Sequence, residues 1–225
     1  MPLYKEIKLN QSTKLYLWKI TEDFDDLFSQ VKLNDSSISR LESMKSSSQK
    51  KGFLAVRMLL QHCGYSDFDM YYDDFGKPHL KLETIREKIQ NTTNNHLHIS
   101  ISHSHTFSTI AISNQNIGID IEILKHKIIK IAPRFMDITH LENLSNEDKI
   151  KKATLIWGIK ESIFKVKNEV GISFTNHIFE NKFSIEDKAT WAFLKFNNEI
   201  EKYKIQFDII EDYTFVCAIK ENVVL

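Results

Sequence analysis

The residues Ile117-Gly118-Ile119-Asp120-Ile121-Glu122-Ile123 alternate between apolar side chains and small or polar ones, which is typical of a strand. Residues two apart share one face of a strand, so the four isoleucines lie together. We expect that face to be buried. Gly118, Asp120 and Glu122 then lie on the opposite face, which presents two carboxylates beside a position with no side chain.

A second stretch, Trp157-Gly158-Ile159-Lys160-Glu161-Ser162-Ile163-Phe164-Lys165, belongs to a helix predicted over residues 145–169. Residues four apart share a helix face, so Trp157, Glu161 and Lys165 form one stripe. If this helix crosses the polar face of the strand, three carboxylates and one ammonium group converge. Such a set suits Mg²⁺ and a bound phosphate, because Mg²⁺ combines one or two carboxylates with water and substrate oxygens.

Each of these features also has an ordinary structural explanation. The solvent face of an edge hairpin often carries acids, which would account for Asp120 and Glu122. Glu161 and Lys165 would form a common stabilising pair on a helix, and Trp157 would be a core residue. Spacing alone leaves both explanations open.

The composition indicates a folded protein without a general affinity for nucleic acid. A chain of 225 residues forms one large domain or two small ones, and six glycines with three prolines argue against long disordered segments. Lys+Arg and Asp+Glu both number 30, whereas a nucleic-acid-binding protein usually has a basic excess. We therefore expect no nucleic-acid partner.

The termini and cysteines indicate a cytoplasmic protein. Residues 1–10 contain no apolar signal segment, and no apolar run approaches the length that spans a membrane. Cys63 and Cys217 lack metal-ligand spacing and lie among apolar residues, so we expect buried, reduced thiols. We predict a soluble cytoplasmic protein with no membrane partner.

The remaining elements follow from periodicity and turn residues. Besides the strand and helix above, we predict strands over residues 15–20, 96–104, 107–113, 190–196, 202–210 and 213–219, and helices that begin at 21–23 and 49. Residues 36–48 form a solvated serine-rich stretch, 71–79 a turn and 81–95 a surface excursion. The strands at 107–113 and 117–123 are predicted to form a hairpin.

Four histidines fall in or next to the strand predicted over residues 96–104: His96, His98, His103 and His105. They could suggest zinc. However, His96 and His98 lie on the opposite face of the strand from His103 and His105, so the four do not converge readily. A zinc site is disfavoured.

Four motifs occur in order along the chain: Gly76-Lys77-Pro78, Ile101-Ser102-His103-Ser104, Gly118-x-Asp120-x-Glu122 and Trp157-x-x-Lys160-Glu161-Ser162-x-x-Lys165. This set resembles the Sfp-type 4′-phosphopantetheinyl transferases in order and approximate spacing. With Arg57 included, the resemblance covers about half of the chain. The most specific part is Gly-x-Asp-x-Glu followed by Trp-x-x-Lys-Glu. The chain departs from the family at His105, where a glycine often follows Ser-His-Ser.

The resemblance implies an α+β fold of two similar lobes related by pseudo-twofold symmetry. Each lobe would pack a small antiparallel sheet with a long helix, and the active site would lie in the cleft between them. We place the N-terminal lobe at residues 1–113 and the C-terminal lobe at residues 114–225, and we expect a monomer. A weak internal similarity between residues 107–112 and 214–219 agrees with such a duplication.

The resemblance also implies an activity: transfer of the phosphopantetheine arm of coenzyme A to a serine of an acyl or peptidyl carrier protein, with release of adenosine 3′,5′-bisphosphate. Coenzyme A is the co-substrate, and Mg²⁺ or Mn²⁺ is the expected metal because oxygen ligands accept both. Asp120 and Glu161 would be metal ligands, and Glu122 would be a ligand or would hold a metal-bound water. Glu161, Lys165 and Asp120 would form the catalytic set.

The resemblance assigns the coenzyme A contacts to residues from several segments. Lys165 would bind the phosphate that is attacked, Ser102 and His103 would contact phosphates, and Arg57 would reach a phosphate. The nucleotide would be lined by Gly76, Lys77 and Pro78. Two rival functions are a coenzyme A-binding module without transfer activity and a metal-dependent phosphodiesterase.

Overall fold

A computed structural model describes residues 3–81 and 97–221. The chain divides into two compact units, residues 1–115 and 116–225, which are described separately. Both units combine helices with antiparallel sheets, so the predicted α+β class is confirmed.

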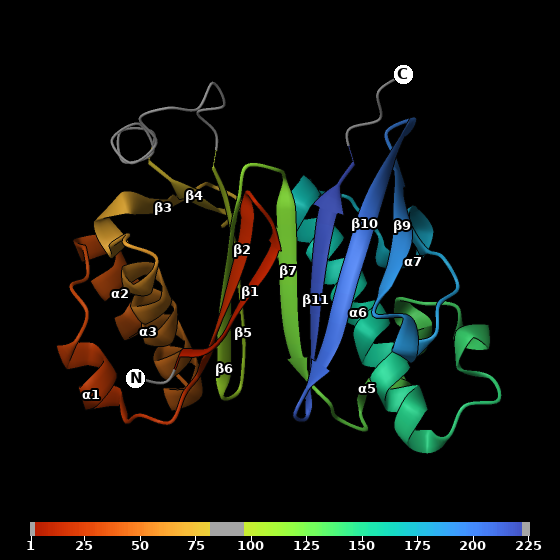
Figure 1. Cartoon of the computed structure of the whole chain (residues 1–225), viewed down its shortest axis with the longest axis horizontal. Coiled ribbons are helices and arrows are strands. Elements are labelled where there is room, and N and C mark those ends of the chain that lie inside the picture. The colour runs from red at the N-terminus through yellow and green to blue at the C-terminus, as the bar shows by residue number, and fades with distance from the viewer. Residues whose placement is uncertain (1–2, 82–96, 222–225) are drawn as a thin grey trace. The chain divides into compact units, whose positions relative to one another are not determined.

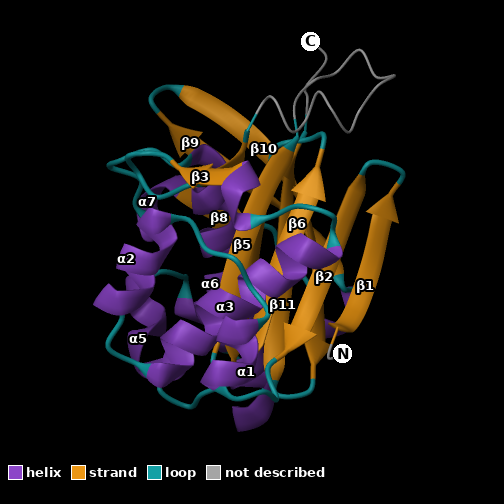
Figure 2. Ribbon diagram, turned by 90° about the vertical axis from the view of Figure 1, so that its left-hand side faces the viewer, coloured by secondary structure: helices purple, strands orange, loops and turns teal. Residues whose placement is uncertain are grey.

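The first unit is built on a four-stranded antiparallel sheet with the order β1-β2-β6-β5 (Figure 2). The strands are β1 (Leu3–Asn10), β2 (Thr13–Lys19), β5 (His98–Ser104) and β6 (Phe107–Ser113). In β2, burial alternates only at the start of the strand, because all residues from Leu15 to Trp18 are buried.

Among the described residues of this unit, the α-helices are α1 (Phe24–Ser29), α2 (Asp35–Ser43) and α3 (Ser47–His62). Figure 2 shows α3 lying against strands β5 and β6 of the sheet, and its middle turns are buried there. The Ser46 hydroxyl accepts the Gln49 amide at 3.4 Å and thereby caps α3.

A small ribbon also belongs to the first unit. After a 3₁₀ turn, η1 (Asp67–Asp69), strand β3 (Met70–Tyr72) pairs with β4 (Pro78–Leu80). Met70 and Leu80 at its base are both 4% exposed and lie in the core of the unit, so the ribbon is anchored at one end.

The second unit contains a five-stranded antiparallel sheet with the order β7-β11-β10-β9-β8 (Figure 1). Its strands are β7 (Ile117–Ile123), β8 (Ile178–Glu180), β9 (Ala189–Phe196), β10 (Glu199–Ile210) and β11 (Tyr213–Lys220). The short helical segments are α5 (Ile128–Ile131), η2 (Ala132–Arg134), η3 (Ile138–Leu141), α7 (Phe174–His177) and η4 (Ile185–Asp187).

One long helix, α6 (Asn146–Lys167), forms the centre of the second unit. The Ser145 hydroxyl accepts the Asp148 amide at 3.1 Å and caps the helix, as predicted. The helix packs on β7 and β11, while α5, η3 and β8 contact it elsewhere. Because neighbours surround it, α6 is buried on several sides and has no wide polar face.

Two glycines set how closely α6 approaches the sheet. A Cβ atom at Gly118 would lie well inside contact distance of the Ser162 carbonyl oxygen, and one at Gly158 would lie 2.7 Å from Val216 Cγ2. Glycine at position 118 of the strand and at position 158 of the helix therefore allows the two backbones to pack directly. The helix crosses the polar face of β7, which is the arrangement that brings the predicted carboxylates together.

Some sequence-based predictions differ from the structure. The hairpin of residues 107–113 with 117–123 is wrong: β2 and β5 already occupy both edges of β6, and β7 pairs with β11. The serine-rich stretch 36–48 is mostly solvated, yet it contains α2, whose first turn is capped by Asn34. Strand β1 was not anticipated. Almost all of the surface excursion predicted at 81–95 lies outside the described residues.

The two cysteines differ in burial. Cys217 is 1% exposed on β11, and burial raises its pKa to about 12, so its thiol stays protonated at neutral pH. Cys63, after α3, is only partly buried. Within residues 3–81 and 97–221, none of the helices has both the length and the apolar character needed to cross a lipid bilayer.

Replacing Gly118 by alanine should destabilise the protein by about 1–3 kcal/mol, the usual cost of overpacking. The added methyl group meets a helix carbonyl rather than the end of a flexible side chain, so relief requires that α6 move. Urea unfolding of G118A measures the change. Lys204→Ala, on an exposed position of β10, is the control and should change stability by less than about 0.5 kcal/mol. Equal stabilities for G118A and the unmodified protein would contradict the close approach.

Candidate functional site

The helix–strand contact brings Lys165 onto Asp120. The Lys165 ammonium lies 2.8 Å from Asp120 Oδ1 and donates to the Ile119 carbonyl at 2.9 Å. The Asp120 side chain is 5% exposed and that of Lys165 is 28% exposed. These residues are 45 positions apart in the sequence. The predicted convergence of the helix stripe on the acidic strand is therefore present for this pair.

Glu161 joins the same charged cluster. Burial is the main reason that its pKa rises to about 7; the carboxylates of Asp120 and Glu122 contribute to the rise, and the Lys165 ammonium opposes it. Glu161 therefore feels the negative charge of both strand carboxylates. A carboxyl group with a pKa near neutrality can accept or release a proton under physiological conditions.

The donor set matches the chemistry of a magnesium site. Three carboxylates that repel one another offer hard oxygen ligands, and one ammonium offsets only part of their charge. As the side chains stand, no three His, Cys, Asp or Glu residues within 3–81 and 97–221 are gathered closely enough to hold an ion. Lys165 occupies one Asp120 oxygen, so a bound cation would compete with this ammonium group.

Two other residues of the helix motif have structural contacts. Trp157 packs edge-on against Phe135 and Phe174, with ring centroids 5.1 and 5.5 Å away, which agrees with its explanation as a core residue. Lys160 is 3% exposed and pairs with Glu180 of β8. The sequence alone does not reveal the role of Lys160, because a buried lysine cannot be recognised without its partner.

In the first unit, Gly76, Lys77 and Pro78 lie at the tip of the β3–β4 ribbon. Gly76 has φ +81°, a left-handed conformation that favours glycine. The Asp73 carboxylate accepts the Lys77 amide at 2.9 Å and contacts His79 Nε2 at 2.9 Å. The bond to His79 is the main reason that the Asp73 pKa lies below its usual value.

His79, for which the sequence indicated no role, thus helps to hold this turn. Its ring also stacks on Tyr71, with centroids 5.3 Å apart. The Lys77 side chain is half-buried, and burial lowers its pKa. An ammonium group that has already lost much of its water is well prepared to bind an anion.

Ser102 and His103 lie near the end of β5. Ser102 is 7% exposed, whereas His103 is solvent-exposed. A Cβ atom at Gly52 would lie 2.8 Å from His103 Cδ2, so the absence of a side chain at Gly52 lets the imidazole rest against α3. His105 has φ +50°, which places a non-glycine residue in the left-handed region at the position where the sequence departs from the family pattern.

Arg57 is buried on α3 and is not a solvated arginine on the flank of the helix. It is 2% exposed, and its Nε atom donates to Asp67 Oδ1 at 2.9 Å. Its guanidinium carbon lies 3.4 Å from the centroid of the Phe53 ring. The surroundings of Arg57 are therefore a carboxylate and an aromatic face of the same unit.

Comparison with known protein families bears on the second unit. Residues 116–219 match the model of the 4′-phosphopantetheinyl transferase superfamily. The matched region includes Asp120, Glu122, Glu161 and Lys165, and it supports phosphopantetheine transfer as the general activity. It spans just under half of the chain. No curated protein matches the chain.

The raised pKa of Glu161 predicts a stability cost that depends on pH. Between the ordinary glutamate pKa and about 7, the folded protein binds more protons than the unfolded chain, so stability falls as pH rises through this window. Glu161→Gln should therefore stabilise the metal-free protein by about 1–3 kcal/mol at about pH 8, and less at about pH 5.

Urea unfolding of both proteins at the two pH values measures this difference. Glu142→Gln, a substitution of an exposed glutamate in the same unit, serves as the control and should have no such effect. A Glu161→Gln variant that is less stable than the unmodified protein at the higher pH would contradict the charge cluster.

Proposed function

We propose that the protein transfers the phosphopantetheine arm of coenzyme A to a serine of an acyl or peptidyl carrier protein. The observation that carries the proposal is the meeting of Asp120, Glu161 and Lys165 at one helix–strand contact. The superfamily match covers the same residues. Two motifs of the first unit, the Gly76–Pro78 turn and the end of β5, carry polar groups suited to binding phosphates.

We further propose that Asp120, Glu122 and Glu161 hold Mg²⁺, with Mn²⁺ as an alternative. The bound cation would supply charge neutralisation at the pyrophosphate of coenzyme A, a reaction in which positioning and electrostatics do most of the work. The effect of the Asp120 and Glu122 charges on the Glu161 pKa supports this assignment, and the three side chains would have to draw closer together to hold the ion.

The proposed reaction is a displacement at phosphorus. The carrier serine Oγ forms a bond to the phosphorus that bears the pantetheine arm, and the bond from that phosphorus to the bridging oxygen breaks. Adenosine 3′,5′-bisphosphate leaves with the bridging oxygen, and the serine proton passes to the Glu161 carboxylate.

Lys165 acts on the phosphate in this proposal. Its ammonium group already neutralises a carboxylate in the cluster and is 28% exposed, so it is accessible to a ligand that approaches Asp120. A positive charge at this place stabilises the negative charge that develops on the phosphate and leaving group. Lys77, Ser102 and His103 are proposed to contact the remaining phosphates, with Gly76 and Pro78 beside the nucleotide.

Several finer assignments stay predictions. They are the Sfp-type subfamily, the pseudo-twofold relation of the halves, the monomeric state and the cytoplasmic location. The choice between acyl and peptidyl carriers is tested by offering both.

The function is tested by the intact mass of apo carrier proteins after incubation with this protein, coenzyme A and Mg²⁺. We expect a gain of one phosphopantetheine arm on the carrier, and no gain when EDTA replaces Mg²⁺, because the charge on the pyrophosphate is then not offset. A gain that persists in EDTA would contradict the metal assignment. Coenzyme A binding without any gain on either carrier class would favour the binding-module alternative.

Asp120→Asn tests the role of the charge cluster in the same assay. It keeps the size of the side chain but removes a ligand charge and the partner of Lys165, so the rate should fall by at least about a hundredfold, or about 2.7 kcal/mol. Asp208→Asn is the matched control, since Asp208 pairs with the exposed Lys188 on the same sheet. Near-normal turnover by D120N would remove Asp120 from the catalytic set.

A further inference from the structure

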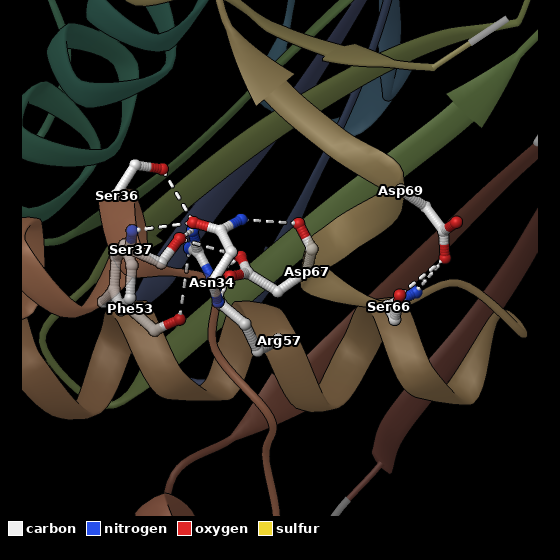
Figure 3. Close-up of polar contacts among 8 residues, drawn as sticks. All are labelled: Asn34, Ser36, Ser37, Phe53, Arg57, Ser66, Asp67 and Asp69. Atoms are coloured by element: carbon white, nitrogen blue, oxygen red, sulfur yellow. Dashed lines mark hydrogen bonds and ion pairs between the residues drawn. The ribbon is translucent and has the colours of Figure 1, made fainter.

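Arg57 is the centre of a buried polar network in the first unit (Figure 3). Besides the bond from Nε to Asp67, its Nη2 atom donates to Ser37 Oγ at 3.2 Å and its Nη1 atom to the Phe53 carbonyl at 3.5 Å. The Ser37 hydroxyl donates in turn to Asp67 Oδ1 at 2.9 Å. The guanidinium group is thus engaged within the unit along several directions.

Asp67 links this network to two other elements. Its Oδ2 atom accepts the Asn34 amide at 2.9 Å, and its carbonyl accepts Asn34 Nδ2 at 3.0 Å. Asn34 also caps α2 through the Ser37 amide at 2.9 Å. Figure 3 shows Arg57 of α3 and Asn34 and Ser37 at the start of α2 gathered around Asp67. One carboxylate therefore joins α2, α3 and η1.

Asp67 is also the first residue of η1, which runs directly into strand β3. Farther along the ribbon, the Tyr72 ring at the end of β3 lies 4.2 Å from the Arg40 guanidinium and 6.0 Å from that of Arg57. The turn that holds Gly76 and Lys77 follows at once. The root of the ribbon is therefore fixed to Arg57 through Asp67, while the end of β3 lies closer to Arg40 than to Arg57.

We infer that Arg57 is a positioning residue that sets the place of the Gly76–Pro78 turn through Asp67, and does not itself contact a coenzyme A phosphate. This inference rests on the proposed function for the part that concerns coenzyme A. Exposure of 2% and pairing with a carboxylate leave the guanidinium facing the interior of the first unit. A buried charge pair with satisfied hydrogen bonds favours one arrangement of the elements that it joins.

The substitution Asp67→Asn separates positioning from direct contact. If Arg57 touched a phosphate, loss of the competing carboxylate charge would leave coenzyme A binding unchanged or make it tighter. If Arg57 acts by holding Asp67, the same substitution weakens the anchor of the ribbon, and coenzyme A binding falls. Arg57→Met weakens binding under either role, so D67N is the decisive variant.

Two measurements on the full-length protein test the inference. Amide hydrogen exchange at Phe75 and Lys77 should accelerate by about tenfold or more in both R57M and D67N, while amides in the middle of α6 should not change. The dissociation constant for coenzyme A, measured by calorimetry, should rise by about fivefold or more in both variants. Combining R57M with Lys77→Met should add little to the effect of K77M alone, because both act at one contact.

Thr13→Val is the matched control. It removes a buried hydrogen bond between Thr13 and Ser113 in the same unit, 2.7 Å long, without touching the ribbon. It should lower stability and leave both the turn amides and coenzyme A binding unchanged. If R57M does not fold, Ser37→Ala, which removes one contact from each charged partner, replaces it and should give a smaller effect in the same direction.

The inference would be overturned if amide exchange at Phe75 and Lys77 is unchanged both in D67N and in folded R57M, or in S37A where R57M does not fold. It would also be overturned if D67N binds coenzyme A as tightly as the unmodified protein. Faster exchange in a protein that binds no coenzyme A at all would instead uphold the anchoring of the ribbon and contradict the proposed function. The two failures are therefore distinguishable.

Discussion

The direct contact between the backbone of β7 and helix α6 is the constraint on which the candidate site depends. A side chain at Gly118 would collide with a carbonyl of the helix, and a side chain at Gly158 would collide with Val216 of β11. Because neither position has a side chain, the helix lies close enough for Lys165 to pair with Asp120. The carboxylates of Asp120 and Glu122 then raise the pKa of Glu161. The geometry of the charged cluster is thus set by the absence of two methyl groups.

The same cluster illustrates a conflict between stability and function. Burying Glu161 beside two other carboxylates is unfavourable, and the upward displacement of its pKa measures that cost. The surrounding unit can offset it, because α6 is buried on several sides, and Lys160 ties it to β8 through Glu180. Groups that are unfavourable for folding but persist in a well-packed unit are expected at functional sites.

Periodicity in the sequence predicted the local elements that carry the site. The alternation of residues 117–123 located β7, and Ser145 with the acids that follow located the start of α6. The convergence of the charged residues could be predicted only on the condition that the helix covers the polar face of the strand. Periodicity could not supply strand order: β7 pairs with β11, nearly a hundred residues away, and nothing local to residues 107–123 excludes the hairpin.

The residues that sequence reasoning missed are those whose meaning depends on a distant partner. Lys160 looks like a surface residue on a helix, yet it is buried with the Glu180 carboxylate. Arg57 was assigned a phosphate contact, and nothing in the sequence indicates that its partner is Asp67. The role of Gly158 is likewise hidden in the sequence, because only the position of Val216 reveals why a side chain is excluded there. Such pairings become visible only when the tertiary structure is known.

Anomalous diffraction from crystals grown with Mn²⁺ and coenzyme A tests most directly whether this helix–strand contact builds a metal and phosphate site. The account predicts an ion at the carboxylates of Asp120 and Glu161, with the Lys165 ammonium moved from Asp120 to a phosphate of coenzyme A. No ion at these carboxylates, with Lys165 still paired to Asp120 while coenzyme A is bound, would contradict it.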